Sequence, residues 1–221
     1  MKRGIFMIAE EIMSKDVITL NSTDTIQTAM KVMRENKIRH IPIVDDQKRL
    51  IGLVTTQSIR NAAPSIFYAN EHTDVLHKPL STIMKTNVIT GHPLDFVEDI
   101  AMLFYENKIG CLPILNGQIV VGIISESDLL HTFVKFTGAD QPGSHIEIKA
   151  TNKTGILHEL TAIFKDKNLN ISSILMRPDP TDDKHVIIVI RVKTMNPLNI
   201  VSALQTSGFT VLWPKAPEFS S

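Results

Sequence analysis

The 221-residue chain has no net charge, only one cysteine and few aromatic side chains, which form 5% of it. Its 23 basic and 23 acidic residues balance, so the composition gives no sign of a nucleic-acid partner. A single cysteine excludes a disulfide within the chain and fits a reducing compartment. Cys111 lies in the apolar run 109–114, and we therefore expect it to be a buried core residue rather than a reactive thiol.

Long hydrophobic runs are also missing, because no stretch approaches the roughly 18 apolar residues that a membrane helix needs. The apolar stretch 4–9 is too short for a signal-peptide core before Glu10 interrupts it. We therefore expect a cytoplasmic protein without a membrane partner. Met7 is an alternative start to Met1, and the sequence leaves that choice open.

Known catalytic motifs are absent as well. The chain contains no GxSxG, P-loop, HExxH or paired-cysteine motif. Its eight histidines are scattered rather than spaced as metal ligands. The sequence therefore predicts a protein that is not an enzyme, with no catalytic residue, no metal site and no required cofactor.

The most informative feature is an internal duplication of residues 12–60 in residues 83–130. Four short segments recur at one offset of 71 residues: Ile12-Met13 as Ile83-Met84, Val17–Thr19 as Val88–Thr90, Glu35–Ile38 as Glu106–Ile109, and Pro42-Ile43 as Pro113-Ile114. Gly52 recurs as Gly122 at an offset of 70, so the preceding turn is one residue shorter in the second repeat.

Each repeat predicts an extended segment, a helix, two strands joined by a turn, and a second helix. The first helix has apolar residues at positions i, i+3, i+4 and i+7, namely Ile26, Ala29, Met30 and Met33 in one repeat and Val97, Ile100, Ala101 and Phe104 in the other. A unit of about fifty residues is too small to close a core alone. We therefore expect the repeats to pack as a pseudo-symmetric pair.

The remainder of the chain predicts a different module. The helix after Asp128 ends at Gly138, and 140–144 forms a short hinge. Strands are then predicted near 146–150, 170–175, 185–191 and 210–213, with helices starting at Ile156 and after Pro197. This order is βαββαβ, a ferredoxin-like sandwich, and the whole chain is of the α/β (α+β) class.

The strand-to-helix element Gly122-Ile-Ile-Ser125-Glu-Ser-Asp128 is the strongest candidate for binding a ligand. Gly122 permits close backbone approach, and Ser125 as a helix N-cap precedes free amide groups that favour an anion. The Asp128 carboxylate is suited to accept hydrogen bonds from ribose hydroxyls. The same Ser-x-x-Asp pattern is also typical of a capping box, which requires no ligand, and both interpretations stay open.

Together with Ile38–Pro42, this motif and the duplication resemble CBS domains arranged as a Bateman module. The resemblance implies that a cleft between the repeats binds an adenosine nucleotide (AMP, ADP or ATP), with the aspartate on the ribose and the hydroxyl residue on the phosphate. It assigns one complete site to Thr19, Arg39, His40, Ile41, Gly122, Ser125 and Asp128.

The other cleft would combine Thr55 and Ser58 with Thr90, Gly110 and Cys111. It lacks both the carboxylate and the cation, so we expect one nucleotide site rather than two. Without the resemblance, a surface salt bridge of Arg39 and a half-buried, satisfied His40 would be equally good interpretations.

Residues 144–215 resemble an ACT domain, on the segments 152–157 and 168–171. ACT domains commonly pair edge to edge and bind an amino acid beside the first strand-to-helix turn. The resemblance implies an amino-acid or other small-effector site at Asn152, Thr154, Gly155, Ile156 and Leu157. Members often have Asp and Pro where this chain has Asn152 and Thr154, which leaves Asn152 as a predicted helix cap.

The predicted order is a CBS domain at 8–65, a second at 79–136 and the ACT domain at 144–215. With the segments 92–97, 138–143 and 191–197, it resembles the acetoin-utilisation family of bacilli. This implies a regulatory homodimer linked to acetoin or butanediol catabolism, acting on a target protein that the sequence does not identify. The alternative is a constitutive dimeric scaffold whose ligand clefts are vestigial.

Overall fold

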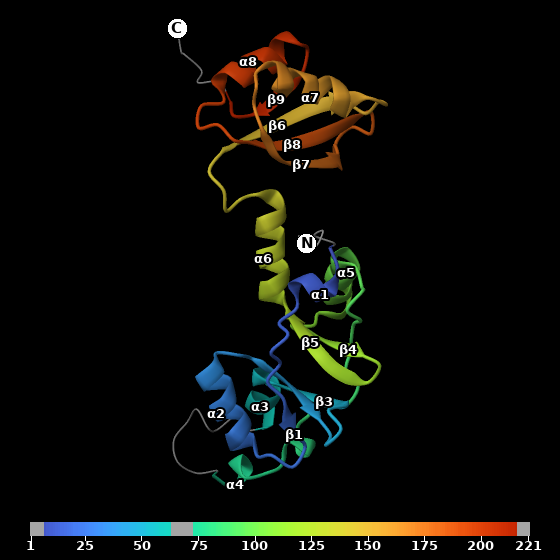
Figure 1. The fold of residues 1–221 in the computed structure, drawn as a ribbon, viewed down its shortest axis with the longest axis vertical. Helices are drawn as coiled ribbons and strands as arrows, with labels where there is room; N and C mark the ends of the chain where they lie inside the picture. Colours follow the sequence, from blue (N-terminus) through green and yellow to red (C-terminus); the bar gives the residue numbers. More distant parts are fainter. Residues whose placement is uncertain (1–6, 63–72, 216–221) are drawn as a thin grey trace, which may run out of the picture. The chain divides into compact units, whose positions relative to one another are not determined.

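The computed structural model describes residues 7–62 and 73–215 (Figure 1). Met1 and residues 63–65 of the first predicted domain lie outside the described residues. The chain divides into two compact units between Leu130 and His131. The more detailed predicted domain bounds stay a prediction, because this division does not test them.

The first repeat forms a three-stranded sheet in which β2 is central, parallel to β1 and antiparallel to β3. Its helix α2 starts after Thr25, whose side chain accepts a hydrogen bond from the Thr28 amide at 3.1 Å. The elements in order are α1 (Ala9–Ile12), β1 (Leu20–Asn21), α2 (Ile26–Asn36), β2 (His40–Val44), β3 (Leu50–Thr55) and α3 (Thr56–Ala62).

The second repeat has the same helix–hairpin–helix order around a two-stranded sheet of β4 and β5. Its hairpin turns at Gly117, whose φ of 64° suits glycine, and is shorter than the 45–49 turn, as predicted. Helix α4 (Thr73–Leu76) and the 3-10 helix η2 (Leu80–Thr82) lie between the repeats. The second repeat contains α5 (Val97–Asn107), β4 (Cys111–Asn116), β5 (Ile119–Ser125) and α6, which runs from Glu126 to Thr137.

The two repeats exchange their leading segments. Met13 lies at the start of the first repeat but packs against the core of the second, where its side chain covers Gly122. Reciprocally, Met84 packs in the core of the first repeat and covers Gly52. Backbone hydrogen bonds join Ser14 to Ile123 and Leu53 to Lys85 in the same reciprocal way. Each repeat is therefore completed by the other, as its small size requires.

The repeated Asn-Lys dipeptide ends the first helix of each repeat. Asn36 and Asn107 each donate a side-chain hydrogen bond to the carbonyl four residues earlier, at 2.9 Å. Lys37 and Lys108 follow in the left-handed region, with φ of 55° and 51°. Glycine usually occupies this left-handed position at the end of a helix, but here both repeats use lysine.

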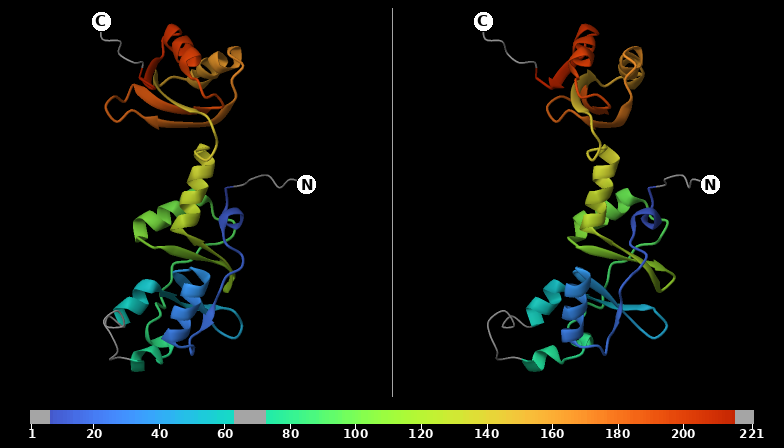
Figure 2. Two further views of the ribbon diagram at one scale, coloured as in Figure 1. Left: turned by 90° about the vertical axis from the view of Figure 1, so that its left-hand side faces the viewer. Right: turned by 60° about the vertical axis from the view of Figure 1, so that its left-hand side comes forward.

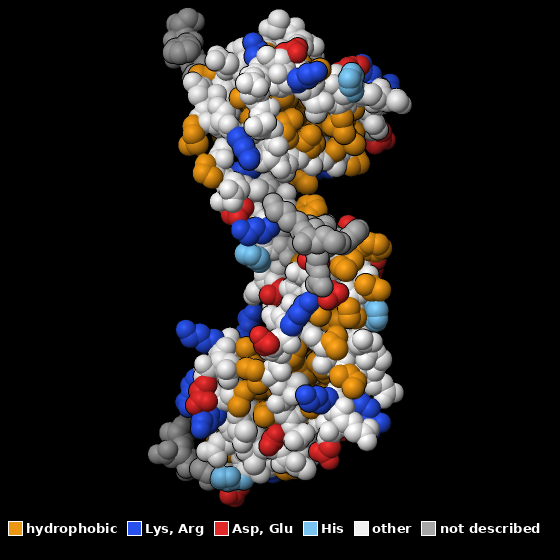
Figure 3. All heavy atoms as spheres, in the orientation of Figure 1, with side chains coloured by type: hydrophobic (Ala, Val, Ile, Leu, Met, Phe, Trp, Pro, Cys, Tyr) orange, Lys and Arg blue, Asp and Glu red, His pale blue; other side chains and the backbone are white. Residues whose placement is uncertain are grey.

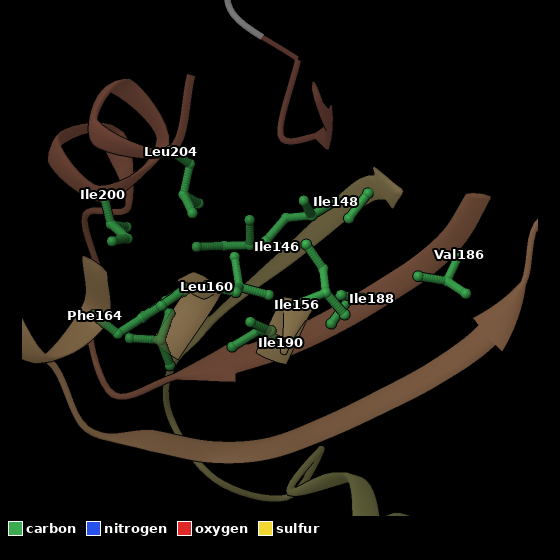
Figure 4. Close-up of a cluster of buried hydrophobic side chains, with 12 residues drawn as sticks. Ile146, Ile148, Ile156, Leu160, Phe164, Val186, Ile188, Ile190, Ile200 and Leu204 are labelled. Carbon is green, nitrogen blue, oxygen red and sulfur yellow. The ribbon is translucent and has the colours of Figure 1, made fainter. Parts of the chain in front are cut away.

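The C-terminal unit has the predicted βαββαβ order, in a sheet of order β7-β8-β6-β9. Helices α7 and α8 send Leu160, Phe164 and Leu204 onto the alternating isoleucines of β6 and β8 (Figure 4). Gly138, with φ of 65°, follows the end of α6 as predicted. The elements are β6 (Ser144–Thr151), α7 (Ile156–Asp166), β7 (Ile171–Pro178), β8 (His185–Val192), α8 (Leu198–Thr206) and β9 (Thr210–Trp213).

Candidate functional site

A cavity of about 320 Å³ lies between the two repeats, within the size range of small-molecule sites. Three stretches form its wall: residues 14–18 before β1, residues 37–42 at the start of β2, and residues 123–128 where β5 passes into α6. The first two stretches belong to the first repeat and the third to the second. Arg39 and Asp128, which the sequence analysis assigned to one crevice, both line it.

The Asp128 carboxylate is oriented by Ser125. Its Oδ2 atom accepts hydrogen bonds from the Ser125 amide at 2.8 Å and from the Ser125 hydroxyl at 2.6 Å. The amide bond is the capping-box contact that the sequence analysis left as an alternative. A carboxylate has about four acceptor positions, which is more than the two hydrogen bonds from Ser125. The half-buried pair combines a helix cap with a place on the cavity wall.

The equivalent pair in the first repeat, Thr55 and Ser58, makes a cap from hydroxyl groups alone. The Ser58 hydroxyl accepts from the Thr55 amide at 2.8 Å, and the Thr55 hydroxyl accepts from the Ser58 amide at 3.1 Å. The Ser58 hydroxyl donates to the Thr55 carbonyl at 2.9 Å. The backbone arrangement is thus preserved without any negative charge.

The opposite wall of the cavity carries Arg39 and His40. The Arg39 side chain is exposed, while its carbonyl accepts a hydrogen bond from the Thr56 amide at 3.0 Å and is thereby fixed at the start of α3. His40 is half-buried, and burial, followed by the neighbouring Arg39 charge, lowers its pKa below 6.5, against a smaller opposing effect of Glu126. His40 is therefore a neutral hydrogen-bonding group at pH 7.

Four of the seven residues predicted for this site line the cavity: Arg39, His40, Ser125 and Asp128. Thr19 and Ile41 are not part of the lining, and Ile41 is fully buried in the core of the first repeat. Gly122 also lies outside the lining. Its close approach is to protein, because a Cβ atom there would come within 2.2 Å of the Met13 sulfur. The expectation that Gly122 makes room for a ligand is therefore corrected.

Several lining residues were not predicted, notably Asp16, Val17, Ile18, Lys37 and Ser127. Val17 and Ile18 belong to a segment recognised only as part of the repeat. Lys37 follows α2 in the left-handed region and lines the cavity together with Arg39. The apolar members of the wall provide a surface on which a flat ring can stack.

Two of the residues assigned to the incomplete second cleft, Gly110 and Cys111, are packed against other protein atoms. Gly110 lies against the His40 ring, where a Cβ atom would be 3.0 Å from Nε2. Cys111 is 4% exposed, and burial raises the pKa of its thiol to about 12. The prediction that Cys111 is a buried core residue is confirmed.

In the C-terminal unit, the turn 152–155 joins β6 to α7. The residue before α7 is Gly155, with φ of 84°, and Asn152 lies three residues earlier with its amide bonded to the Lys184 carbonyl. The prediction of Asn152 as the helix cap was therefore wrong, because the glycine conformation takes that position. Of the five predicted effector residues, only Ile156 lines the cavity of about 250 Å³ found there.

Charged groups beside that cavity are already paired. Lys149 contacts Asp179 at 2.7 Å, and Lys153 contacts Glu159 at 2.8 Å. The Lys149 ammonium and the Thr181 amide hold the pKa of Asp179 far below its usual range. Over residues 7–62 and 73–215, no group of three or more potential metal ligands occurs. Within the same ranges, no helix is long and apolar enough to cross a membrane.

Family models match this arrangement over most of the chain. The CBS domain model matches residues 9–65 and 80–135, which together form half of the sequence. The chain belongs to the CBS domain family. An ACT domain follows, because the ACT domain model matches residues 144–208. CBS and ACT domains are regulatory modules.

Relatives of known sequence share the CBS pair. A CBS domain-containing protein of Dictyostelium discoideum is 31% identical over 134 residues, covering 58% of this chain and 92% of the relative. A homoserine O-acetyltransferase of Methanococcus vannielii is 32% identical over 126 residues, and an L-aspartate semialdehyde sulfurtransferase of Methanocaldococcus jannaschii is 31% identical over 134. These matches cover 57% and 60% of this chain but only 24% of each enzyme, so the enzymes contain extensive sequence beyond the CBS pair.

Solved structures give the same result for the fold. One from Vibrio cholerae, described as an acetoin utilization protein (AcuB), is 29% identical with a TM-score of 0.55 and matches 62% of this chain and 97% of its own. A CBS domain pair crystallised with 5′-methylthioadenosine and S-adenosyl-L-methionine is 28% identical with a TM-score of 0.52. That match covers 62% of this chain and 99% of the other, so a similar CBS pair binds adenosine-containing ligands.

Proposed function

We propose that this chain is a non-catalytic regulatory protein that binds an adenosine nucleotide in the cavity between its CBS repeats. One observation carries the proposal: Asp128 of the second repeat and Arg39 of the first line the same cavity. In this arrangement the Asp128 carboxylate accepts hydrogen bonds from the ribose hydroxyls, and the Arg39 guanidinium binds phosphate. The adenosine compounds bound by the similar CBS pair support this ligand class.

The proposal includes a single nucleotide site per chain. The equivalent position to Asp128 is Ser58, and the equivalent to Arg39 is Gly110, which packs against His40. An adenosine ligand in that second cleft would find neither a carboxylate for its ribose nor a guanidinium for its phosphate. The duplicated fold therefore supplies two geometrically related positions, of which one has the necessary chemistry.

The regulatory output passes to the ACT domain in this proposal. Helix α6 contains Asp128 in its first turn and ends at Thr137, directly before the segment that leads into β6. A small effector of the ACT domain, at or near residues 152–157, would change nucleotide affinity by the same factor by which nucleotide changes effector affinity. Similarity to the acetoin utilization protein supports a role in acetoin or butanediol catabolism, on a target protein still to be identified.

Exposed apolar side chains on α5 support a homodimer. Met102 is 54% exposed and Tyr105 is 82% exposed, and both lie on one face because they are three residues apart. On α6, Leu130 is also 64% exposed, at the position equivalent to Arg60 in the first repeat. A second copy of the chain covering these side chains would remove them from water, which stabilises association.

The alternative function is a constitutive scaffold, favoured by the capping box that Asp128 forms without a ligand. Titration calorimetry distinguishes the two functions. The sensor predicts saturable heat with at least one of AMP, ADP, ATP, NAD and S-adenosylmethionine, at one site per chain. The scaffold predicts no binding heat with any of them, and that result would overturn the proposed function.

A further inference from the structure

A second hollow, of about 790 Å³, adjoins the nucleotide cavity. It lies along α2 and α3, which run side by side in both views of Figure 2. Lys37, Ile38 and Arg39 line both spaces, so the segment from the end of α2 to the start of β2 is a wall that the two share.

The hollow has an apolar floor and a cationic rim. Buried Met33 and Ile59 belong to its floor. Its lining includes five cationic side chains, Lys31, Arg34, Lys37, Arg39 and Arg60. Figure 3 shows Lys and Arg side chains over α2 with acidic side chains among them, and the Lys31 ammonium lies 4.0 Å from the Glu35 carboxylate. Lys31 and Arg34 are three residues apart and lie on one face of α2, and Lys37 follows the helix as its C-cap residue.

The second repeat shows that these cations are not needed for the fold. Its α5 has the same length as α2 and ends in the same Asn-Lys signal, but it carries Met102 in place of Lys31 and Tyr105 in place of Arg34. Cations in the last turn of a helix also interact favourably with the helix dipole. Because α5 forms without basic residues in its last turn, that effect does not account for the whole row.

We infer that the nucleotide carries a polyphosphate tail, with its nucleoside in the smaller cavity and its outer phosphates extending past Arg39 toward Arg34 and Lys31. This inference rests on the proposed nucleotide site and specifies the ligand class within it. Arg39 beside the cavity would bind the first phosphate. Each additional phosphate adds negative charge, which the row of cations on α2 is placed to receive.

The test compares ATP with AMP on the full chain and on the double variant Lys31→Met/Arg34→Tyr, which introduces the residues that α5 carries at these positions. We expect the unaltered protein to bind ATP about fivefold to tenfold more tightly than AMP, since two exposed ion pairs contribute about 1 kcal/mol or somewhat more. The variant should lose that preference while its AMP affinity changes less than about twofold. Added salt should reduce the preference in the unaltered protein.

Lys108→Met is the control, because it removes a lysine that lines neither the hollow nor the nucleotide cavity, and both affinities should stay unchanged. Thermal unfolding of each variant shows whether the fold is retained, and Lys31→Gln/Arg34→Gln replaces the first variant if that one does not fold. Equal affinity of the unaltered protein for AMP and ATP would overturn this inference alone. Equal loss of both ligands in the folded variant would also overturn it, whereas no binding of any adenylate would overturn the proposed function.

Discussion

The two CBS repeats share a backbone plan but differ in the side chains that face ligands. In both repeats the amide that ends the strand donates to a side chain three residues later, from Thr55 to Ser58 in one repeat and from Ser125 to Asp128 in the other. Only the second cap contains a carboxylate. Arg39 stands immediately before β2 in the first repeat, whereas Gly110 stands immediately before β4 in the second.

This difference shows that the cap and the ligand chemistry are separable. A hydroxyl pair satisfies the backbone at the turn as well as a carboxylate does, so the fold does not require Asp128. Arg39 is likewise exposed and is not required for the core. Asp128 and Arg39 are therefore available for binding a ligand. They come from opposite repeats, and both line the cavity between the repeats.

The largest effects on stability are expected where the two repeats exchange segments. Gly52→Ala should lower the free energy of unfolding by about 2–3 kcal/mol, the cost of overpacking a core. A Cβ atom there would meet both the Met84 sulfur at 2.7 Å and the Lys85 carbonyl at 3.2 Å. Gly122→Ala should cost only about 1 kcal/mol, because the nearest atoms all belong to the flexible Met13 side chain. Denaturant unfolding measures both changes.

Paired substitutions sharpen this comparison. Met13→Ala should be less destabilising in the Gly122→Ala background than alone, because the two changes relieve one contact. Met84→Ala should relieve Gly52→Ala only in part, since the backbone carbonyl of Lys85 remains. Strict additivity in both pairs would contradict the exchanged packing.

A smaller effect is expected on self-association. Met102→Lys/Tyr105→Arg transfers the charged residues of α2 to the exposed face of α5 and should weaken a homodimer by about tenfold or more, since it introduces like charges facing one another. Sedimentation equilibrium measures the change, and unfolding should be unaffected because both side chains are exposed. An unchanged dimer would exclude this face of α5 as the interface. The self-association of Lys31→Met/Arg34→Tyr, which makes the opposite exchange on α2, is measured for comparison.

Much of the fold could be predicted because its signals are local or periodic. The offset of the repeats, the βαββαβ order, the helix end at Gly138 and the burial of Cys111 follow from spacing and from single residues. The role of Gly122 could not be predicted, because its partner Met13 lies more than one hundred residues away in the sequence. Lys37 was missed for a related reason, since its left-handed backbone and its place between two cavities depend on the packed structure.

The most direct test of the account compares adenylate binding by Asp128→Ala and Ser58→Ala. Both changes remove a cap at equivalent positions, so both should lower stability by about 1 kcal/mol. Asp128→Ala should also weaken adenylate binding by about 1.5–3 kcal/mol, the contribution of a charge-assisted hydrogen bond, while Ser58→Ala should leave the affinity nearly unchanged. Equal losses of affinity in the two variants, or none in either, would contradict a single nucleotide site built from both repeats.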